Sequence, residues 1–447
     1  MAIRIYNTLT KKKEVFRSKR GKKVSMFVCG PTTYDYAHMG NAKTYTQFDI
    51  IANYLRQRGL KVTYIQNITD IDDKIIKKAK KSNKDPLALS HYFYRAYKED
   101  MEKLGNRAVS KYVKATERMK EIISQVKRLE EKGFTYTTPE GVYFNLEKDR
   151  EYGKLSGRTR LQAEDATSRI DESREKRNKG DFCLWKFAKE GEVSWPSPFG
   201  KGRPGWHIED TAITEKEFGQ QYDIHGGAVD LIFPHHEAEI AQMESLSGKK
   251  PFVRYWMHAG FLDMKREKMS KSKGNIITVR EIMNNYPPKV VRFFFASSHY
   301  RSRINFSEDV LDQARNGLER MNDCIQSLNN EDDIAMVREV RKKFYEAMDD
   351  DINTPKAFAA IFEFITERNK KGHGGKKTLA FFKEVDEIFG VFSWKESIPS
   401  YVKKLAEQRE RARKEKRWRE ADEMRRKIET GGYTIEDSEE GFKVKKR

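Results

Sequence analysis

Cysteine is scarce in this sequence of 447 residues. Its three cysteines, Cys29, Cys183 and Cys324, are odd in number and far apart. This pattern excludes a disulfide scaffold and predicts a reducing compartment, the cytoplasm. Long apolar runs are missing too: no segment approaches the roughly 20 residues of a membrane span, and the N-terminus lacks the apolar core of a signal peptide. We therefore predict a cytoplasmic protein with no membrane partner.

Acidic side chains are in deficit. Lys and Arg number 88 and Asp and Glu 68, which gives a formal net charge of +20. A thermophile-like surface explains a charged fraction of 35% but not the imbalance. The excess favours a polyanionic partner, nucleic acid ahead of an anionic membrane. Apolar residues make up only 37% of the chain, yet 12% aromatic residues suffice for buried cores, so a fully disordered chain is excluded.

The first hundred residues predict an open α/β sheet. Residues 24–29 have the pattern of a buried strand, residues 41–58 that of a helix, and residues 62–66 that of a second strand. Strand, glycine-bearing turn, helix and parallel strand make a βαβ unit. Ligands of such sheets bind at the carboxyl ends of strands, beside helix N-termini. The turn at 29–41 is therefore the first candidate site.

The remaining sequence adds an insertion and a helical region. Residues 134–200 look irregular and rich in Gly, Pro and aromatics, as in an insertion. Strand-like patterns return at 222–232, and Pro234 predicts a helix over 235–246. After residue 288 the chain has a helical pattern almost to residue 388. The predicted fold class is α/β: a Rossmann-type parallel-sheet catalytic domain with an insertion, then an all-α bundle and a small basic C-terminal region.

The first motif is His38-Met39-Gly40-Asn41, which follows a strand and opens a helix. A helix N-terminus favours anions, and Gly40 lets a flat ring approach the backbone. His38 and Asn41 can donate hydrogen bonds to phosphate oxygens. Four residues alone make a weak signal, so a surface turn remains the alternative.

The second motif runs from Lys268 to Asn275 and reads Lys-Met-Ser-Lys-Ser-Lys-Gly-Asn. Lys268 and Lys271 can neutralise the charge that develops on leaving pyrophosphate when such a loop closes. A basic surface loop is the alternative, but this string is rarely met by chance. Its pairing with the first motif at the opposite end of an α/β fold favours the catalytic interpretation.

The two motifs resemble the HIGH and KMSKS signatures of class I aminoacyl-tRNA synthetases, and the chain from about residue 3 to its end resembles the cysteinyl-tRNA synthetases. The sequence Glu-Asp-Thr-Ala at residues 209–212 resembles that of an archaeal branch of the family. Besides the two signatures, the resemblance is carried by Cys29-Gly30-Pro31-Thr32, Tyr34-Asp35, residues 66–74, Gly205-Trp206-His207-Ile208-Glu209, His225-Gly226-Gly227 and Phe233-Pro234-His235-His236-Glu237.

The resemblance implies a cysteine–tRNA ligase with ATP, L-cysteine and tRNA(Cys) as partners, and magnesium bound with the ATP. No long heptad run is present, so a monomer is the default expectation. The domains it implies are the first half of the catalytic domain (1–105), a connective insertion (106–200), the second half with a metal site (201–265), the KMSKS loop and stem-contact region (266–300), a helical bundle (301–395) and an anticodon-recognition region (396–447).

A metal site is expected around Cys29. His235 and Glu239 stand at i and i+4 and share one helix face, so they can chelate a metal together, although a surface hydrogen bond is the alternative. The resemblance implies one zinc held by Cys29, Asp210, His235 and Glu239, which selects the substrate thiol. Asp210 departs from the family, which has Cys there. Both ligands carry one negative charge, so we expect zinc to be retained, with loss of zinc as the alternative.

The resemblance also implies the remaining pocket. Thr69 and Trp206 would close over the amino acid, with core packing as the alternative, and His225 would lie beside it. ATP would meet His38, Gly40, Asn41, Gly226, Gly227, Asp230, Lys268 and Lys271. His207 and His236 are expected to be structural.

The C-terminal segment is strongly basic. Residues 403–427 contain 12 Lys or Arg and 6 Asp or Glu. A solvated helix with ion pairs is one explanation; phosphate neutralisation with base stacking on Trp418 is the other. The resemblance implies that Arg413, Trp418, Arg425 and Asp437 contact the anticodon.

Two rival functions share parts of this pattern. A non-catalytic RNA-binding paralogue is favoured weakly by Asp210, but the intact motifs oppose it. A cysteine ligase that uses an amino-sugar acceptor would share the adenylation chemistry, but it gives no reason for the basic C-terminal segment. ATP turnover separates the paralogue from the enzymes, and the choice of acceptor separates the two ligases.

Overall fold

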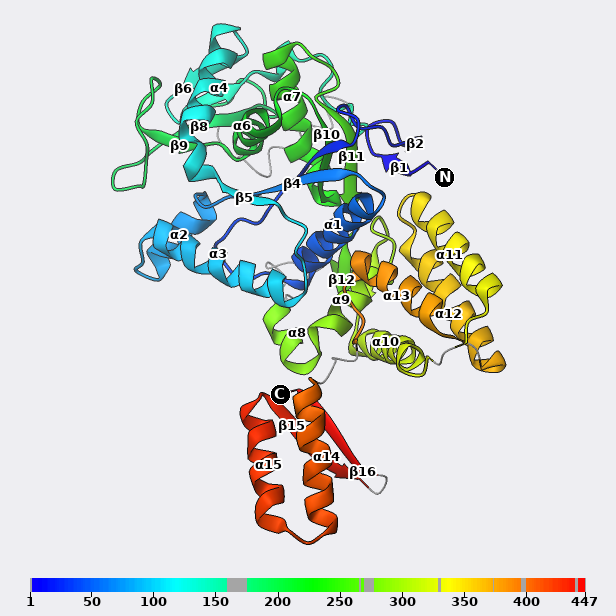
Figure 1. Ribbon diagram of the computed structural model, residues 1–447. Helices are drawn as coiled ribbons and strands as arrows, with labels where there is room; N and C mark the ends of the chain where they lie inside the picture. Colours follow the sequence, from blue (N-terminus) through cyan, green and yellow to red (C-terminus); the bar gives the residue numbers. More distant parts are fainter. Residues whose placement is uncertain are drawn as a thin grey trace. The chain divides into compact units, whose positions relative to one another are not determined.

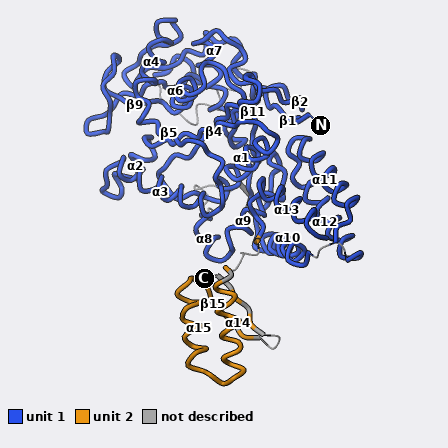
Figure 2. The backbone as a smooth tube through the Cα atoms, in the orientation of Figure 1, with its two compact units in different colours: residues 1–392 blue, residues 393–447 orange. Residues whose placement is uncertain are grey.

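A computed structural model describes residues 2–158, 175–264, 267–268, 277–328, 331–372, 374–394, 399–438 and 441–446. The chain divides into two compact units, Met1–Phe392 and Ser393–Arg447, which Figure 2 colours separately. Each unit has a hydrophobic core of its own. Within the described ranges, no helix combines the length and the apolarity needed to cross a membrane.

A five-stranded parallel sheet forms the centre of the first unit (Figure 1). In spatial order its strands are β11 (Val253–Ala259), β10 (Tyr222–Ala228), β3 (Lys23–Val28), β4 (Lys61–Ile68) and β5 (Lys111–Lys114). The consecutive strands β3 and β4 pair in parallel, as the βαβ prediction requires. The strand order switches between β3 and β10, and open α/β sheets bind ligands at such a point.

Helix α1 (Met39–Gln57) joins β3 to β4 and is buried along most of its length. A capping box fixes its start: His38 Nδ1 accepts from the Asn41 N–H at 3.2 Å, and Asn41 Oδ1 accepts from the His38 N–H at 3.4 Å. The helix therefore begins slightly before the predicted start at residue 41. It packs against the sheet and also against α9 (Pro288–Ala296) and α13 (Lys376–Phe389).

Further elements surround the parallel sheet. β1 (Arg4–Asn7) and β2 (Lys12–Val15) form an antiparallel hairpin, and β12 (Leu262–Met264), β13 (Glu267–Lys268) and β14 (Ile304–Phe306) form a three-stranded sheet. The helices of this part are α2 (Asp73–Lys81), α3 (Pro86–Lys103), α4 (Met119–Glu131), α6 (Trp206–Phe218) and α7 (Glu237–Ser247), with short turns at Ala115–Arg118, Leu146–Lys148 and Val229–Leu231.

The insertion is more regular than its sequence indicates. An antiparallel sheet links β6 (Thr135–Thr138), β7 (Gly141–Phe144), β8 (Phe182–Phe187) and β9 (Gly202–Pro204). The strands are short, and β7 is buried at every position, so the sequence has no clear two-residue alternation there. The irregular pattern predicted over 134–200 is therefore wrong for β6, β7 and β8.

The helix expected from Pro234 starts later. Ile232–His236 forms a separate π-helical turn in which Phe233 has an extended conformation (φ −136°, ψ 132°). An extended residue cannot continue an α-helix, so α7 begins only at Glu237. His235 consequently lies in the turn before the helix, although it still reaches the side chain of Glu239, four residues on.

Helices dominate the rest of the first unit, as predicted. They are α8 (Val279–Asn285), α9, α10 (Glu308–Gln326), α11 (Ile334–Asp349), α12 (Thr354–Lys371) and α13. A buried ion pair joins this part to the parallel-sheet part, because Arg292 Nη2 on α9 lies 2.6 Å from Asp49 Oδ2 on α1. Both side chains are about 1% exposed, so water does not screen the pair.

The second unit is small. Helices α14 (Ser400–Lys414) and α15 (Trp418–Thr430) pack together, and β15 (Tyr433–Ser438) pairs with β16 (Gly441–Lys446). Its core consists of Val402, Ala406, Ile428 and Ile435. Most other side chains of the two helices are exposed, which explains the low apolar content of this segment.

Candidate active site and metal centre

The first unit contains a cavity of about 380 Å³ in its helical part and another of about 610 Å³ at the sheet. The larger lies at the carboxyl end of β3, where the sequence places the candidate site. Its walls come mainly from the turn at residues 29–41, with Lys74, Asp230 and Gly260 among the others. Five predicted site residues line it: Cys29, His38, Gly40, Asn41 and Asp230.

Four buried side chains with atoms that can ligate a metal converge around Cys29, which lines this cavity. Cys29 Sγ lies 3.0 Å from Asp210 Oδ2 and 4.0 Å from Glu239 Oε1. His235 Nε2 lies 3.1 Å from Asp210 Oδ2 and 3.1 Å from Glu239 Oε1. The four ligand atoms all lie within 4.8 Å of one another, so one ion can contact all of them. The four predicted ligands are therefore brought together by the fold.

The electrostatics of this cluster favour a cation. Burial raises the pKa of Cys29 well above its usual value, and the charges of Asp210 and Glu239 add to that rise. Burial and the charge of Asp210 likewise raise the pKa of Glu239 well above its usual value. Among the described atoms, Asp210 Oδ1 and Glu239 Oε2 are buried without a hydrogen-bond partner. A thiolate, an imidazole and two carboxylates with unsatisfied oxygens form a donor set that fits zinc.

A second donor set overlaps the first. Cys29, His225, His236 and Glu239 also lie within reach of one ion. His236 Nε2 is 3.1 Å from Cys29 Sγ, and its Nδ1 is 2.8 Å from His258 Nε2. Burial lowers the pKa of His236 well below its usual value, so the ring is neutral at pH 7. Sequence reasoning set His236 aside as structural and missed His258, which has no motif around it.

Trp206, Thr69 and His225 lie beside the metal ligands. The Trp206 ring stacks on the His235 ring, with 4.1 Å between centroids and an interplanar angle of 21°. Thr69 Oγ1 donates to Glu209 Oε2 at 2.8 Å. His225 Nδ1 lies 2.6 Å from the Tyr222 hydroxyl, and its Nε2 lies 3.5 Å from Cys29 Sγ. These contacts give all three side chains a packing role; their roles toward substrate stay predictions.

Close packing inside the protein explains why residues 226 and 227 are both glycine. Both Gly226 and Gly227 are buried. A Cβ atom on Gly226 would lie 2.4 Å from the Phe48 ring, and one on Gly227 would lie 2.8 Å from the His236 ring. Neither distance is tolerable, so any larger residue would displace α1 or the histidine. Contact with adenosine remains a prediction for this pair.

The His38 motif is built for hydrogen-bond donation. Since His38 Nδ1 accepts from the Asn41 N–H, the proton of the neutral ring resides on Nε2. A Cβ atom on Gly40 would come within 3.0 Å of this ring, so glycine lets His38 fold over the start of α1. The backbone N–H groups at this end of a buried helix favour a phosphate.

The chain segments that precede and follow the second motif both lie beside α1. On one side, the Met39 N–H donates to Ile277 O at 3.1 Å and the Val279 N–H donates to Ala37 O at 2.9 Å. On the other, Lys43 Nζ of α1 donates to Gly260 O, just before β12, at 2.6 Å. It also donates to Ser302 O, just before β14, at 3.0 Å. Residues 269–276, with the predicted Lys271, lie outside the described residues. Lys268 belongs to β13, opposite Asp263 of β12.

The predicted RNA contacts of the second unit lie on helices and a strand that are largely exposed. Trp418, the first residue of α15, is 57% exposed. Asp437 binds Arg409 through two oxygens at 2.7 and 3.0 Å and also pairs with Arg413. These arginines lower the pKa of Asp437 to about 2. Arg425 Nε lies 3.4 Å from Glu429 Oε1.

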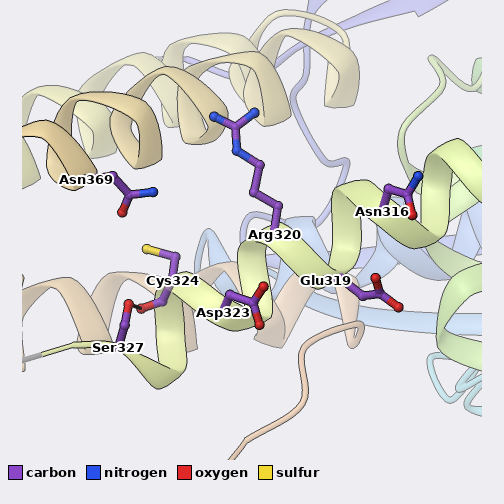
Figure 3. Close-up of a pocket in the computed structure, with 7 residues that line it drawn as sticks. All are labelled: Asn316, Glu319, Arg320, Asp323, Cys324, Ser327 and Asn369. Carbon is purple, nitrogen blue, oxygen red and sulfur yellow. Dashed lines mark hydrogen bonds between the residues drawn. The ribbon is translucent and has the colours of Figure 1, made fainter.

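The smaller cavity, between α10 and α12, offers no comparable chemistry (Figure 3). Arg320 extends toward α12 and donates to Thr366 Oγ1 at 2.6 Å. Burial raises the pKa of Cys324, so this thiol remains protonated and behaves as a core side chain. The lining residues are Asn316, Glu319, Arg320, Asp323, Cys324, Ser327 and Asn369.

Known proteins define the class of this fold. A model of the class I (C) tRNA synthetase catalytic domain matches residues 15–316, and a DALR domain model matches residues 343–393. The methionyl-tRNA synthetase of Mycobacterium tuberculosis, solved with methionyl-adenylate, superimposes with a TM-score of 0.61 at 14% identity, covering 82% of this chain and 89% of that one. A leucyl enzyme (LeuRS) of Agrobacterium radiobacter, solved with tRNA, gives 0.62 at 12% identity, covering 83% and 84%. The fold is that of a class I aminoacyl-tRNA synthetase, which confirms the predicted fold class.

Curated relatives define the family. The cysteine–tRNA ligase of Thermococcus gammatolerans is 44% identical over 472 aligned residues, which cover 99% of this chain and 98% of the relative. That of Caldicellulosiruptor saccharolyticus is 42% identical over 465, covering 99% and 100%. A model of the cysteinyl-tRNA ligase anticodon-binding domain matches residues 396–444. The chain therefore belongs to the cysteinyl-tRNA synthetases, a family of enzymes, as the sequence predicts.

Proposed function

We propose that this cysteine–tRNA ligase activates L-cysteine with ATP in the 610 Å³ cavity and transfers it there to the 3′ end of tRNA(Cys). One observation carries the proposal: Cys29, which belongs to the cluster of four metal-ligand side chains, lines the same cavity as the donors His38 and Asn41. A thiol-recognising group and a phosphate-binding helix end in one hollow are what cysteine adenylation needs. The relatives' name supports the same assignment.

Adenylation is a phosphoryl-group displacement. The cysteine carboxylate oxygen attacks the α-phosphorus of ATP, the bond from that phosphorus to the bridging oxygen breaks, and pyrophosphate leaves with the electron pair. His38 Nε2–H, the Asn41 amide and the N-terminus of α1 hold phosphate oxygens while negative charge develops. Lys268 and Lys271 neutralise pyrophosphate from the other side, and magnesium accompanies the ATP. No covalent enzyme intermediate is required.

Selection of cysteine rests on Cys29, Asp210, His235 and Glu239. These side chains would hold one zinc ion, and a zinc ion there would supply an affinity for the substrate thiolate that the neutral hydroxyl of serine could not match. Trp206 would cover the substrate from its stacked position on His235, with Thr69 and His225 beside it. Gly226, Gly227, Gly40 and Asp230 would border the adenosine.

The tRNA anticodon would be read by the second unit. Trp418 has the exposure that base stacking requires. Arg413 and Arg425 supply positive charge, and Asp437 orients Arg413 as well as Arg409. We further propose that the enzyme is a cytoplasmic monomer of the archaeal type. Its domains would have the limits given above.

The test is amino-acid-dependent ATP–pyrophosphate exchange with cysteine and serine in parallel, on protein of measured zinc content. We expect exchange with cysteine only, lost on chelation and restored by zinc. Cys29→Ser should remove zinc binding or cysteine affinity, and the matched control Cys324→Ser should change neither. Normal zinc content with normal cysteine affinity in Cys29→Ser would overturn the four-ligand site.

The same assay separates the rival functions. Exchange with neither amino acid would favour a non-catalytic RNA-binding paralogue. Cysteine-dependent exchange without charging of tRNA(Cys) would favour a ligase with an amino-sugar acceptor. Exchange with both amino acids would mean that Asp210 has weakened selection of the thiol.

A further inference from the structure

Helix α2 carries a concentrated positive charge beside the cavity. From residue 74 to residue 84 the chain contains six lysines and no acidic residue. Ile75 and Ala79 are buried and pack with Leu89 and Phe93 of α3. At 100° per residue, Lys77 and Lys81 point to the side opposite these two apolar residues, whereas Lys78 lies closer to them. The helix therefore presents a lysine-covered face to solvent.

Most of this charge has no nearby counter-charge. Lys78 pairs with Asp35 at 3.0 Å. Asp73, the single acid of α2, is engaged by Lys186 at 2.9 Å and by Arg203. Five exposed lysines have no carboxylate within 4.0 Å in the part of the chain that the structure describes: Lys74, Lys77, Lys80, Lys81 and Lys84. Some exposed lysines of other helices do have one, as Lys127 with Glu131 and Lys343 with Glu339.

The position of the helix relates this charge to the reaction. Lys74, in the first turn of α2, lines the cavity, and the helix continues from there for about 10 Å to Lys81. Tyr92 of α3 is 56% exposed, and its hydroxyl lies 2.7 Å from that of Tyr36, which also lines the cavity. Cationic side chains with an exposed aromatic ring are the combination that holds single-stranded nucleic acid.

We infer that Lys74, Lys77 and Lys81, the lysine strip, together with Tyr92, guide the single-stranded 3′ end of tRNA into the cavity. The inference rests on the proposed function, because it takes this cavity as the place where tRNA is charged. The lysines neutralise successive phosphates of the incoming strand, and Tyr92 offers a ring on which a base stacks. The strip acts in the transfer step and has no part in adenylation.

The test uses the full-length, zinc-loaded enzyme with Lys77 and Lys81 both changed to Ala; Lys74 is kept because it lines the cavity. We expect the KM for tRNA to rise about tenfold, with kcat nearly unchanged. The slope of log(kcat/KM) against log salt should become shallower by about 2, one for each lost phosphate contact. ATP–pyrophosphate exchange should stay within about twofold of the parent enzyme, since adenylation does not involve tRNA.

Three comparisons make the result specific. Lys120→Ala with Lys127→Ala removes two exposed charges from α4, which does not line the cavity, and should leave the KM for tRNA unchanged. Tyr92→Phe should retain the ring and the KM, whereas Tyr92→Ala should raise the KM. Binding of tRNA without its unpaired 3′ nucleotides should be equal for the parent enzyme and the double lysine variant.

Two outcomes would overturn the inference. One is an unchanged KM and salt slope in the double lysine variant. The other is a binding defect of equal size with truncated and complete tRNA, which would place the strip on the helical part of the tRNA. Failure of the proposed function is distinct from both, because it would appear as missing cysteine-dependent exchange in the parent enzyme.

Discussion

The two units of this chain handle charge in opposite ways. In the first unit, Asp210 and Glu239 are buried side by side with Cys29, and burial together with mutual repulsion raises the pKa of Glu239. In the second, Asp437 is 39% exposed, and Arg409 and Arg413 lower its pKa. A buried group of like charges must be neutralised by protons or by a cation, whereas exposed opposite charges satisfy one another. The contrast distinguishes a site that needs a ligand from a surface that does not.

The largest expected difference is in the stability lost when a buried arginine or an exposed arginine is replaced. Arg292→Met would leave the buried carboxylate of Asp49 without its ion-pair partner, because the pair is fully enclosed. We expect the free energy of unfolding of the first unit to fall by about 3–5 kcal/mol. Urea denaturation followed by circular dichroism measures this loss, and Arg338→Met, at an exposed position on α11, is the matched control with a change below about 0.5 kcal/mol. A loss no larger than that of the control would contradict the prediction.

Removal of metal should affect one unit only. At a free zinc concentration one hundred times the dissociation constant, binding stabilises the folded unit by about 2.7 kcal/mol, and a chelator removes that amount. Hydrogen exchange should therefore accelerate in α7, which follows His235, and remain constant in α14. Equal acceleration in both helices, or in neither, would show that the cluster around Cys29 does not hold the metal.

Replacement of Asp210 should sharpen the comparison within the metal cluster. Asp210→Cys restores a soft thiolate, so we expect zinc affinity to rise about tenfold, or roughly 1.4 kcal/mol. Asp210→Asn keeps the size of the side chain but removes its charge, and it should lower the affinity. Competition with a chromophoric chelator measures both changes. Equal affinities in all three proteins would mean that residue 210 is not a ligand, and His236 would become the first candidate to replace it.

The smallest effect belongs to the exposed pair. The pKa of Asp437 is about 2 when folded, below the unfolded value near 3.9, so its stabilisation is complete above pH 4 and is lost as the pH falls toward 2. Asp437→Asn should cost the second unit at most about 1 kcal/mol at neutral pH and flatten the dependence between pH 4 and 2. Amide hydrogen exchange in α14 between pH 4 and 2 measures this stability of the second unit. An unaltered pH dependence would argue against the ion pairs with Arg409 and Arg413.

Much of the candidate site follows from local sequence. The His38 motif predicts a helix start because its own side chains cap α1, and Cys29 falls at the end of a strand that its apolar neighbours define. The helix start after Pro234 is mispredicted, because residues 232–236 form a separate π-helical turn with Phe233 extended before the proline, and proline at position one is only a tendency. Within the insertion, β7 could not be predicted from alternation, since its uniform burial removes the two-residue pattern on which strand prediction depends.

The sequence by itself determined the βαβ unit, the start of α1 at the His38 motif and the family, because each depends on residues that are neighbours in the chain or on ordered strings. Only the tertiary structure decided which distant groups meet. Cys29 and Asp210 are 181 positions apart, and Lys43 reaches carbonyl groups 217 and 259 positions away. The partners of Asp437, the contact of His236 with Cys29, and the place of α2 beside the cavity were decided in the same way. Such contacts depend on packing of whole elements, and burial then sets the pKa of each group that packing encloses.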